Sequence, residues 1–589
     1  MKHYIKQTDF FIFLFCIILP FSNTIYANDI DSADASLVKE TLGIDSDLSD
    51  LFPESDTADI KNNLEDNSKD KDKTPEITKD IEDIKESLKD NDTKANKFYL
   101  QDIELIGNKL YSEKELKKLY LKYIDTYITI DDLYYIRNII KNHYQTTGYL
   151  LTEVLLIPQE LNKYGATAKI KIVESYFSEV EYTDYKNSGI KYYIKNITDS
   201  IPANMQVLEN NLLLINRLPG INAKGVIGPA EHTPGSSKLF IDAKEKKYGS
   251  YFAFNNHASL NVGPQQIRSG FHINNISWSN QLSFNLGFTP KNTDNMVFMG
   301  LEYKNYFYHF NGMELKLNYE YSKTKPHLST LAAINLQGIN TKYQAEVTYP
   351  YIVNRTTTSL LQLGINGYDN RSKNITGLAF QDKYRTLYIG NTTRTKDGYN
   401  GTSLLNTKLV YGFEAGRAAK NIATSRANLE NKPITGSFAK ATMDFNYHLN
   451  LSRKISLQTT INGQMTTGPV FSSEQISYGG QLFGLGYGQS GLIGDMGIMA
   501  KIEAKYNHYL NNQEVFNLSQ AFVSFDAGHI RSHNGTPAIK TAQSFGLGLR
   551  LISIKGLEVN LTLAKPLVKD ILERKDNTYS WYFSVQKTF

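Results

Sequence analysis

The 589-residue chain contains a single cysteine, Cys16, which lies in an apolar run from Phe10 to Phe21. Two lysines precede this run and Ala27 follows it. A basic start, a short apolar core and a small residue at the exit are typical of a secretory signal peptide, so we expect cleavage after residues 1–27. The mature chain would then have no cysteine, which excludes disulfides, thiol catalysis and cysteine metal sites.

The chain also lacks long apolar runs. No later segment reaches about 18 consecutive apolar residues, which excludes a membrane-spanning helix. Yet 39 Tyr and 29 Phe accompany a mean hydropathy of −0.38. The strands of a transmembrane β-barrel alternate apolar and polar residues, so their mean hydropathy stays low. Composition therefore favours such a barrel, with a soluble β-rich protein as the alternative.

Enzyme motifs are absent from the sequence. It has neither a GxxxxGK[ST] phosphate loop nor an HExxH motif, and its 11 histidines are scattered without ligand spacing. The segment Gly488-Gln-Ser-Gly491 lacks the GxSxG spacing of a nucleophile elbow. We expect no catalytic residue, no cofactor, no metal, and neither a nucleotide nor a nucleic acid as a partner.

Residues 28–97 are strongly acidic, with 21 acidic and 10 basic side chains. Such a segment buries too little apolar surface to offset its ordering entropy. We expect an acidic linker, in which Ala33–Leu42 forms a short helix.

Two α/β modules are expected after the linker. Residues 98–174 read as strand, helix, helix, strand, strand, with Ser112 and Thr129 as helix caps. Residues 175–246 repeat this order. An exposed strand edge beside a helix accepts an extended peptide as an added strand, so we expect the modules to bind a client. The alternative is that they are inert spacers.

From 247 to 589 the pattern changes to a period of two. Leu282, Phe284 and Leu286, for example, alternate with polar or small residues. We count about sixteen strands, which start near residues 248, 265, 280, 296, 311, 341, 355, 382, 401, 437, 453, 496, 518, 541, 556 and 579. A barrel of this size encloses an aqueous channel. The expected fold class is an all-β transmembrane barrel of about 16 antiparallel strands, preceded by two periplasmic α/β modules.

One glycine-rich stretch, residues 472–503, lies between two strand-like segments. Glycine adopts positive φ without strain, so a long loop can fold in a narrow space. Loops of this length without secondary structure are usually functional. On the strand count it is the sixth long loop, on the extracellular side, and we expect it to fold back into the channel. A loose surface loop is the alternative.

Several motifs resemble those of the outer-membrane transporters of two-partner secretion, the haemolysin and filamentous-haemagglutinin secretion family. Ser472–Glu503 is similar to the family's SSEQF…GG…VRGY…GDxG…E loop, and Phe525-Asp526-Ala527-Gly528 to its FxDxG barrel-wall motif. The matching loop residues are Gly479, Gly480, Gly484, Leu485, Gly486, Tyr487, Gly494 and Asp495; those of the wall are Phe525, Asp526 and Gly528. The module motifs match at Gly148, Tyr149, Pro158, Gln159, Leu161, Gly165, Leu218, Pro219 and Gly220.

The resemblance covers residues 98–589 and implies what the chain does. It implies two polypeptide-transport-associated (POTRA) modules in the periplasm that recognise an unfolded exoprotein, of the adhesin or haemolysin type. A channel in the bacterial outer membrane, surrounded by lipid, would carry this partner to the cell surface. The aromatic residues Trp581, Phe583 and Phe589 resemble the C-terminal signal that outer-membrane assembly machinery reads. An assembly factor of the same superfamily is the alternative; a passive porin would need no modules.

The loop departs from the family pattern at one position. The family carries arginine in VRGY, where this chain has Leu485. In the family that arginine pairs with the wall aspartate, so Asp526 would lack its partner, and an unpaired buried charge is costly. Three alternatives follow: another basic residue, with Lys501 and Lys505 as candidates, pairs with Asp526; channel water solvates it; or the loop is held in another way. We expect the loop to be held less tightly than in relatives that keep the arginine.

Overall fold

The computed structural model describes the chain from residue 97 onward. Within this range it leaves out 183–187, 231–234, 278, 328–331, 333, 414–423, 427–436, 511–514, 534–539 and 569–578. The expected signal peptide at 1–27 and the linker with its helix at Ala33–Leu42 lie outside the described residues.

The first module packs two helices against one face of a four-stranded sheet. Its elements are β1 (Phe98–Ile106), α5 (Glu113–Tyr120), η4 (Leu121–Tyr123), β2 (Thr126–Ile128), α6 (Ile130–Thr146), β3 (Glu153–Leu156) and β4 (Ala166–Val173). The sheet order is β2-β1-β4-β3, so β2 and β3 are its edges. Ser112 and Thr129 cap α5 and α6 as expected, each in a capping box. The sequence pattern does not predict β2, because three residues are too few to show a period.

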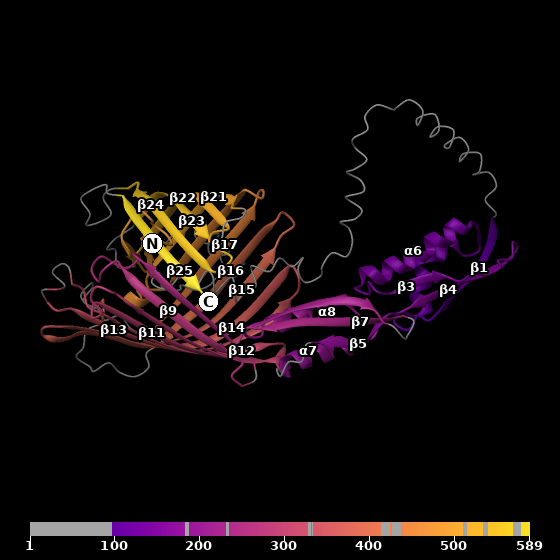
Figure 1. Ribbon diagram of the computed structural model, residues 1–589, viewed down its shortest axis with the longest axis horizontal. Helices are drawn as coiled ribbons and strands as arrows, with labels where there is room; N and C mark the ends of the chain where they lie inside the picture. The colour runs from indigo at the N-terminus through magenta and orange to yellow at the C-terminus, as the bar shows by residue number, and fades with distance from the viewer. Residues whose placement is uncertain are drawn as a thin grey trace, which may run out of the picture.

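The second module repeats the design with a three-stranded sheet. Its elements are β5 (Tyr176–Tyr182), α7 (Ser188–Thr198), α8 (Met205–Asn216), β6 (Ile221–Pro229) and β7 (Ser236–Glu245). The sheet order β5-β7-β6 leaves β5 and β6 as edges. The modules are joined where the Met205 amide donates to the Gly148 carbonyl at 2.9 Å. Figure 1 shows both modules extending from one end of the barrel.

The third part is a closed barrel of sixteen antiparallel strands. They are β8 (Tyr248–Asn255), β9 (Gln266–Asn274), β10 (Asn280–Phe288), β11 (Met296–Phe307), β12 (Met313–Thr324), β13 (Gln337–Val353), β14 (Thr357–Asn374), β15 (Gly377–Lys396), β16 (Gly401–Phe413), β17 (Phe438–Asn450), β18 (Ile455–Thr466), β21 (Met496–Tyr509), β22 (Leu518–Arg531), β23 (Lys540–Ile552), β24 (Leu557–Pro566) and β25 (Ser580–Thr588). The ring closes where β25 pairs with β8, with Val585 opposite Phe254. The strand count is confirmed.

The barrel strands turn apolar side chains outward and polar ones inward. Phe284, Leu301 and Leu363 are exposed on the outer surface, although each is large and apolar. Such a surface is stable when lipid covers it. Within the described residues, no helix is long and apolar enough to cross a membrane.

The second module sits against a turn of the barrel. Tyr192 of α7 packs on Tyr308 and His309, which lie between β11 and β12, with ring centroids 5.5 and 4.8 Å apart. Asn275, between β9 and β10, donates to the Pro219 carbonyl at 2.9 Å. The turns that join β9 to β10 and β11 to β12 therefore lie at the module end. Because neighbouring strands are antiparallel, every second connection lies at this end, and the others, such as that between β18 and β21, lie at the far end.

Candidate functional site

The glycine-rich stretch forms a folded hairpin inside the barrel. Loop 6, residues 467–495, joins β18 to β21 at the far end, as expected. It contains η7 (Ser472–Glu474) and a hairpin of β19 (Ile476–Tyr478) and β20 (Leu492–Gly494), so it is not without secondary structure. The core of the hairpin packs on the inner face of the wall, where Ile476, Tyr478 and Ile530 of β22 are fully buried.

Loop 6 spans the channel from one wall to the other. Near its start, Ser473 is 2.7 Å from the hydroxyl of Tyr384 on β15. At its tip, the Gly486 carbonyl accepts a hydrogen bond from Ser580 of β25 at 3.1 Å. In the ring of sixteen strands β15 and β25 lie eight strands apart, on opposite sides. The loop therefore crosses the lumen rather than lining one wall.

Asp526 organises the loop tip. It lies on the inner face of β22 and is fully buried. Its carboxylate accepts hydrogen bonds from the amides of Gly484 at 2.8 Å and Leu485 at 3.5 Å, from the Ser544 hydroxyl at 2.7 Å and from the Tyr478 hydroxyl. All four donors are neutral. Hydrogen bonds to a carboxylate are stronger than those between neutral groups, so backbone and hydroxyl donors supply what the arginine does in the family pattern.

The expectation that Lys501 or Lys505 replaces the arginine is wrong. Lys501 lies opposite Asp526 in the β21–β22 register. However, Lys501 and Lys505 pair with Glu503, at 3.8 and 3.5 Å. Arg550 joins the same carboxylate at 2.7 Å. The buried Glu503 therefore holds these cations, and Asp526 is satisfied without them.

Two glycines of the motifs make room for close contacts. A Cβ on Gly528 would lie 2.3 Å from the Tyr478 ring, so the wall glycine lets this ring lie flat on β22 and reach Asp526. A Cβ on Gly486 would lie 2.3 Å from the Pro566 backbone nitrogen on β24. Gly479, Gly480 and Gly484 of the loop take positive φ. Glycine alone allows both the close approaches and these conformations at low cost.

The remaining motif residues of the loop and wall have different surroundings. The Tyr487 hydroxyl donates to the Gln543 carbonyl at 2.9 Å, and its own carbonyl accepts from Tyr582 at 3.1 Å. Phe525 points outward and is exposed. Asp495 is fully buried at the base of the loop, where Arg426 and the amides of Val470 and His533 donate to it, so its partners differ from those of Asp526.

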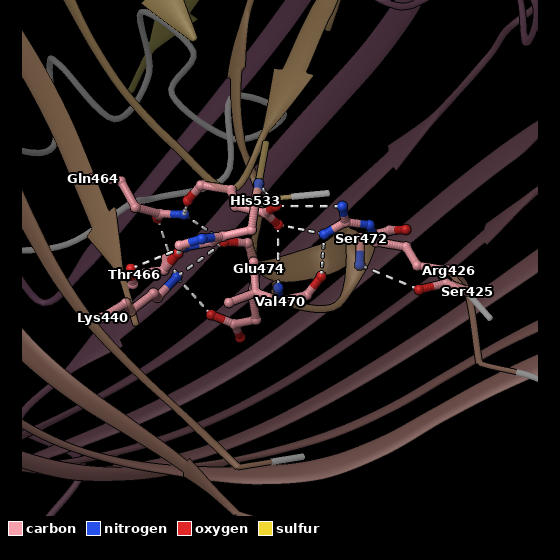
Figure 2. A network of polar contacts seen from close by, with 10 residues as sticks. Ser425, Arg426, Lys440, Gln464, Thr466, Val470, Ser472, Glu474 and His533 are labelled. Carbon is pink, nitrogen blue, oxygen red and sulfur yellow. Dashed lines mark hydrogen bonds and ion pairs between the residues drawn. The ribbon is translucent and has the colours of Figure 1, made fainter. Parts of the chain in front are cut away.

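The base of loop 6 rests on residues that the motifs did not include. Figure 2 shows Arg426, Lys440 and Gln464 converging on the two ends of the loop. Arg426 pairs with Asp495, and Lys440 with Glu474 at 2.6 Å. The sequence contains one indication of these partners. Residues 467–495 have two acidic residues and no basic one, so any cation that pairs with them must come from another segment of the chain.

The module motifs form turns and junctions. Gln159 donates to the Lys169 carbonyl at 2.9 Å and accepts from its amide at 2.7 Å, which fixes the segment before β4. Gly148 ends α6 with φ +98°, and Gly220 follows α8 with φ +67°. Leu218 is buried in the second module. Tyr149, Pro158, Leu161 and Gly165 lie in the segments that flank β3. These residues shape the modules, while β2, β3, β5 and β6 supply their free edges.

Comparisons with known proteins agree with this architecture. The family model described as haemolysin secretion/activation protein ShlB/FhaC/HecB matches residues 235–551, and the ShlB-type POTRA domain matches 98–175. No curated protein sequence matches.

Solved structures share the fold. CdiB from Escherichia coli superposes with a TM-score of 0.67 at 16% identity, over 84% of this chain and 91% of that one. CdiB from Acinetobacter baumannii gives 0.60 at 15% identity, over 86% of this chain and 97% of that one.

The first of the two family models covers more than half of the chain, and the second covers the first module. In this family the barrel lies in the outer membrane and the POTRA modules in the periplasm. The chain thus belongs to the ShlB/FhaC/HecB haemolysin secretion/activation family and is a two-partner secretion transporter of the outer membrane.

Proposed function

We propose that an extended exoprotein, of the adhesin or haemolysin type, binds the free strand edges of the modules and then passes loop 6 in the channel. The observation that carries this proposal is the path of loop 6, which crosses the lumen between β15 and β25. A chain entering at the module end must pass this segment. Loop 6 is therefore the constriction of the channel.

The modules offer docking edges at the entrance. Tyr127 on β2, Leu155 on β3 and Val226 on β6 are exposed apolar side chains on edge strands. An extended client added to such an edge gains main-chain hydrogen bonds, and its side chains contact these residues. Because main-chain hydrogen bonds do not depend on the side chains, such an edge can bind many client sequences. A client that passes through the channel unfolded requires binding of this kind.

We propose that transport proceeds without catalysis. Asp526 and Asp495 accept hydrogen bonds from backbone amides and fixed side chains, an arrangement that holds a loop in place. Among the described residues, no group of three or more histidine, cysteine, aspartate or glutamate side chains could hold a metal ion. Folding of the client outside the cell is the proposed driving force.

The last strand carries the proposed assembly signal. Trp581 and Phe589 are exposed on the outer surface, and Phe583 shares the outward face of β25. Their position suits both contact with lipid and recognition by the outer-membrane assembly machinery.

Deletion of residues 98–246 tests the proposed role of the modules. We expect secretion of the exoprotein to stop while the barrel still inserts, as shown by heat-modifiable mobility in gel electrophoresis. Secretion at the normal level by an inserted, module-free barrel would refute it.

A further inference from the structure

Loop 6 depends on cations from other parts of the chain. Residues 467–495 contain Glu474 and Asp495 as their acidic residues and no lysine or arginine. Both carboxylates are buried, Glu474 at 5% exposure and Asp495 at 0%. A buried carboxylate is retained only where it is paired or fully hydrogen-bonded.

Asp495 is the point at which three loops meet. Arg426 comes from loop 5, the connection between β16 and β17, of which residues 424–426 and 437 are described. Its guanidinium donates to both carboxylate oxygens of Asp495, with Nη2 3.3 Å from Oδ2. The amide of His533, in the connection between β22 and β23, donates to the same carboxylate at 2.9 Å.

Arg426 also reaches the start of loop 6. Its Nη1 donates to the Val470 carbonyl at 2.8 Å, and the Val470 amide donates to Asp495 at 3.2 Å. One buried guanidinium thus joins residues near the first and last positions of the loop (Figure 2). The planar fork of arginine suits such a contact, whereas lysine is a point charge without this geometry.

A second pair lies beside the first. Lys440 of β17 contacts Glu474 at 2.6 Å, and the Tyr384 hydroxyl donates to Glu474 at 2.9 Å. Gln464 of β18 donates to the carbonyls of both Glu474, at 2.7 Å, and Asp495, at 3.0 Å. The two ion pairs and this amide connect both ends of loop 6 to the wall.

The wall and the loop exchange roles between the tip and the base of loop 6. At the tip the wall gives the carboxylate, Asp526, and the loop gives neutral donors. At the base the loop gives the carboxylates, and loop 5 and β17 give the cations. We propose that Arg426 is a positioning residue for secretion, which holds loop 6 across the channel from its base. This inference rests on the proposed role of loop 6 as the constriction.

Single-channel recording of the purified full-length protein in planar bilayers tests the proposal. Removing one partner of a buried ion pair leaves the other uncompensated, so we expect Arg426→Gln and Asp495→Asn each to raise the frequency of large openings about tenfold. Arg426→Lys keeps the charge and should lie between Arg426→Gln and the wild type. The double variant Arg426→Gln with Asp495→Asn should be no worse than either single variant, because coupled residues are non-additive.

Lys304→Gln is the matched control. Lys304 pairs with Glu302 at 3.1 Å on β11, close to the turn at the module end. This variant removes the same charge from the barrel wall, and openings should stay at the wild-type frequency. Equal effects of Lys304→Gln and Arg426→Gln would overturn the proposal, because the effect would then be that of wall charge alone. Wild-type openings in both Arg426→Gln and Asp495→Asn would also overturn it.

Labelling of a single cysteine gives a second readout. Leu492 of β20 is buried, and the expected mature chain has no cysteine. In a Leu492→Cys background, Arg426→Gln should speed reaction with a membrane-impermeant maleimide severalfold, and equal rates would contradict the proposal.

Deletion of residues 477–493 distinguishes the role of loop 6 as the constriction from the role of Arg426 in positioning it. Permanently large conductance after this deletion, with no effect of Arg426→Gln, would overturn the role of Arg426 alone. Unchanged conductance after the deletion would overturn both that role and the constriction.

Discussion

Asp526 shows how a buried charge is kept without an opposite charge. Its four donors come from β19, the loop tip and β23. Backbone structure or packing fixes each donor, so the Asp526 carboxylate is satisfied without an ion pair. The missing arginine at Leu485 was visible in the sequence, but the replacement was not. Two of the four donors are backbone amides, which every residue except proline has, so no residue type signals them.

Asp526→Asn should loosen the loop tip. Each carboxylate oxygen of Asp526 accepts from one backbone amide and one hydroxyl, and an NH2 group in place of either oxygen cannot accept from them. The hydroxyl can turn to accept instead, but the backbone amide is left unsatisfied at a cost of about 1–3 kcal/mol. We expect more frequent large openings in bilayer recordings. Asp369→Asn is the control, because Asp369 pairs with Arg371 at 2.6 Å on β14, far from the tip. Identical traces for Asp526→Asn and the wild type would show that the tip is held otherwise.

Leu485→Arg should not restore a tighter loop. Leu485 is buried at 3% exposure, and its side chain lies against Gly546. Asp526 already accepts four hydrogen bonds, so an added guanidinium would overfill the site, at a cost of about 1–3 kcal/mol. We expect greater current fluctuation than in the wild type. A quieter channel would show that Asp526 has capacity for a cation.

Among the elements, the barrel strands are well predicted by the alternation of apolar and polar residues along the sequence. The largest differences between expected and observed strand starts are four residues at β13 and five at β15. Alternation is local, so it can be read from one sequence. The partners of loop 6 are not local: Arg426 lies 69 residues from Asp495, and Tyr384 lies 90 from Glu474. Such contacts depend on barrel closure and have no periodic signal.

Gly528→Ala should separate β19 from β22. The new methyl group would lie 2.3 Å from the Tyr478 ring, so the ring must move away from Asp526. We expect larger conductance and faster maleimide labelling of Leu492→Cys. Gly463→Ala is the control, since the nearest atom to a Cβ there is 3.8 Å away. If both alanine variants behave alike, close packing of Tyr478 does not hold the hairpin.

At the scale of the molecule, the modules and the channel form one path. The second module contacts the barrel turn between β11 and β12 through Tyr192. Its edge strands therefore lie near the entrance, and loop 6 crosses the lumen beyond it. We infer that a client meets these parts in order: module edge, entrance, loop 6.

Tyr192→Ala should weaken this alignment without affecting the channel itself. Loss of the aromatic contacts with Tyr308 and His309 weakens the attachment of the module to the turn by about 0.5–1.5 kcal/mol per aromatic pair. We expect slower exoprotein secretion with unchanged bilayer conductance. Unchanged secretion would show that the alignment of this module does not limit transport.

A disulfide that locks loop 6 in the channel tests whether this loop is the constriction that the exoprotein passes. Leu485→Cys combined with Gly546→Cys places two thiols where the side chain and the wall are already in contact. After oxidation we expect secretion of the exoprotein to stop and a reductant to restore it, with each single variant as a control. Secretion at the wild-type rate with the disulfide fully formed would show that loop 6 is not the constriction that the client passes.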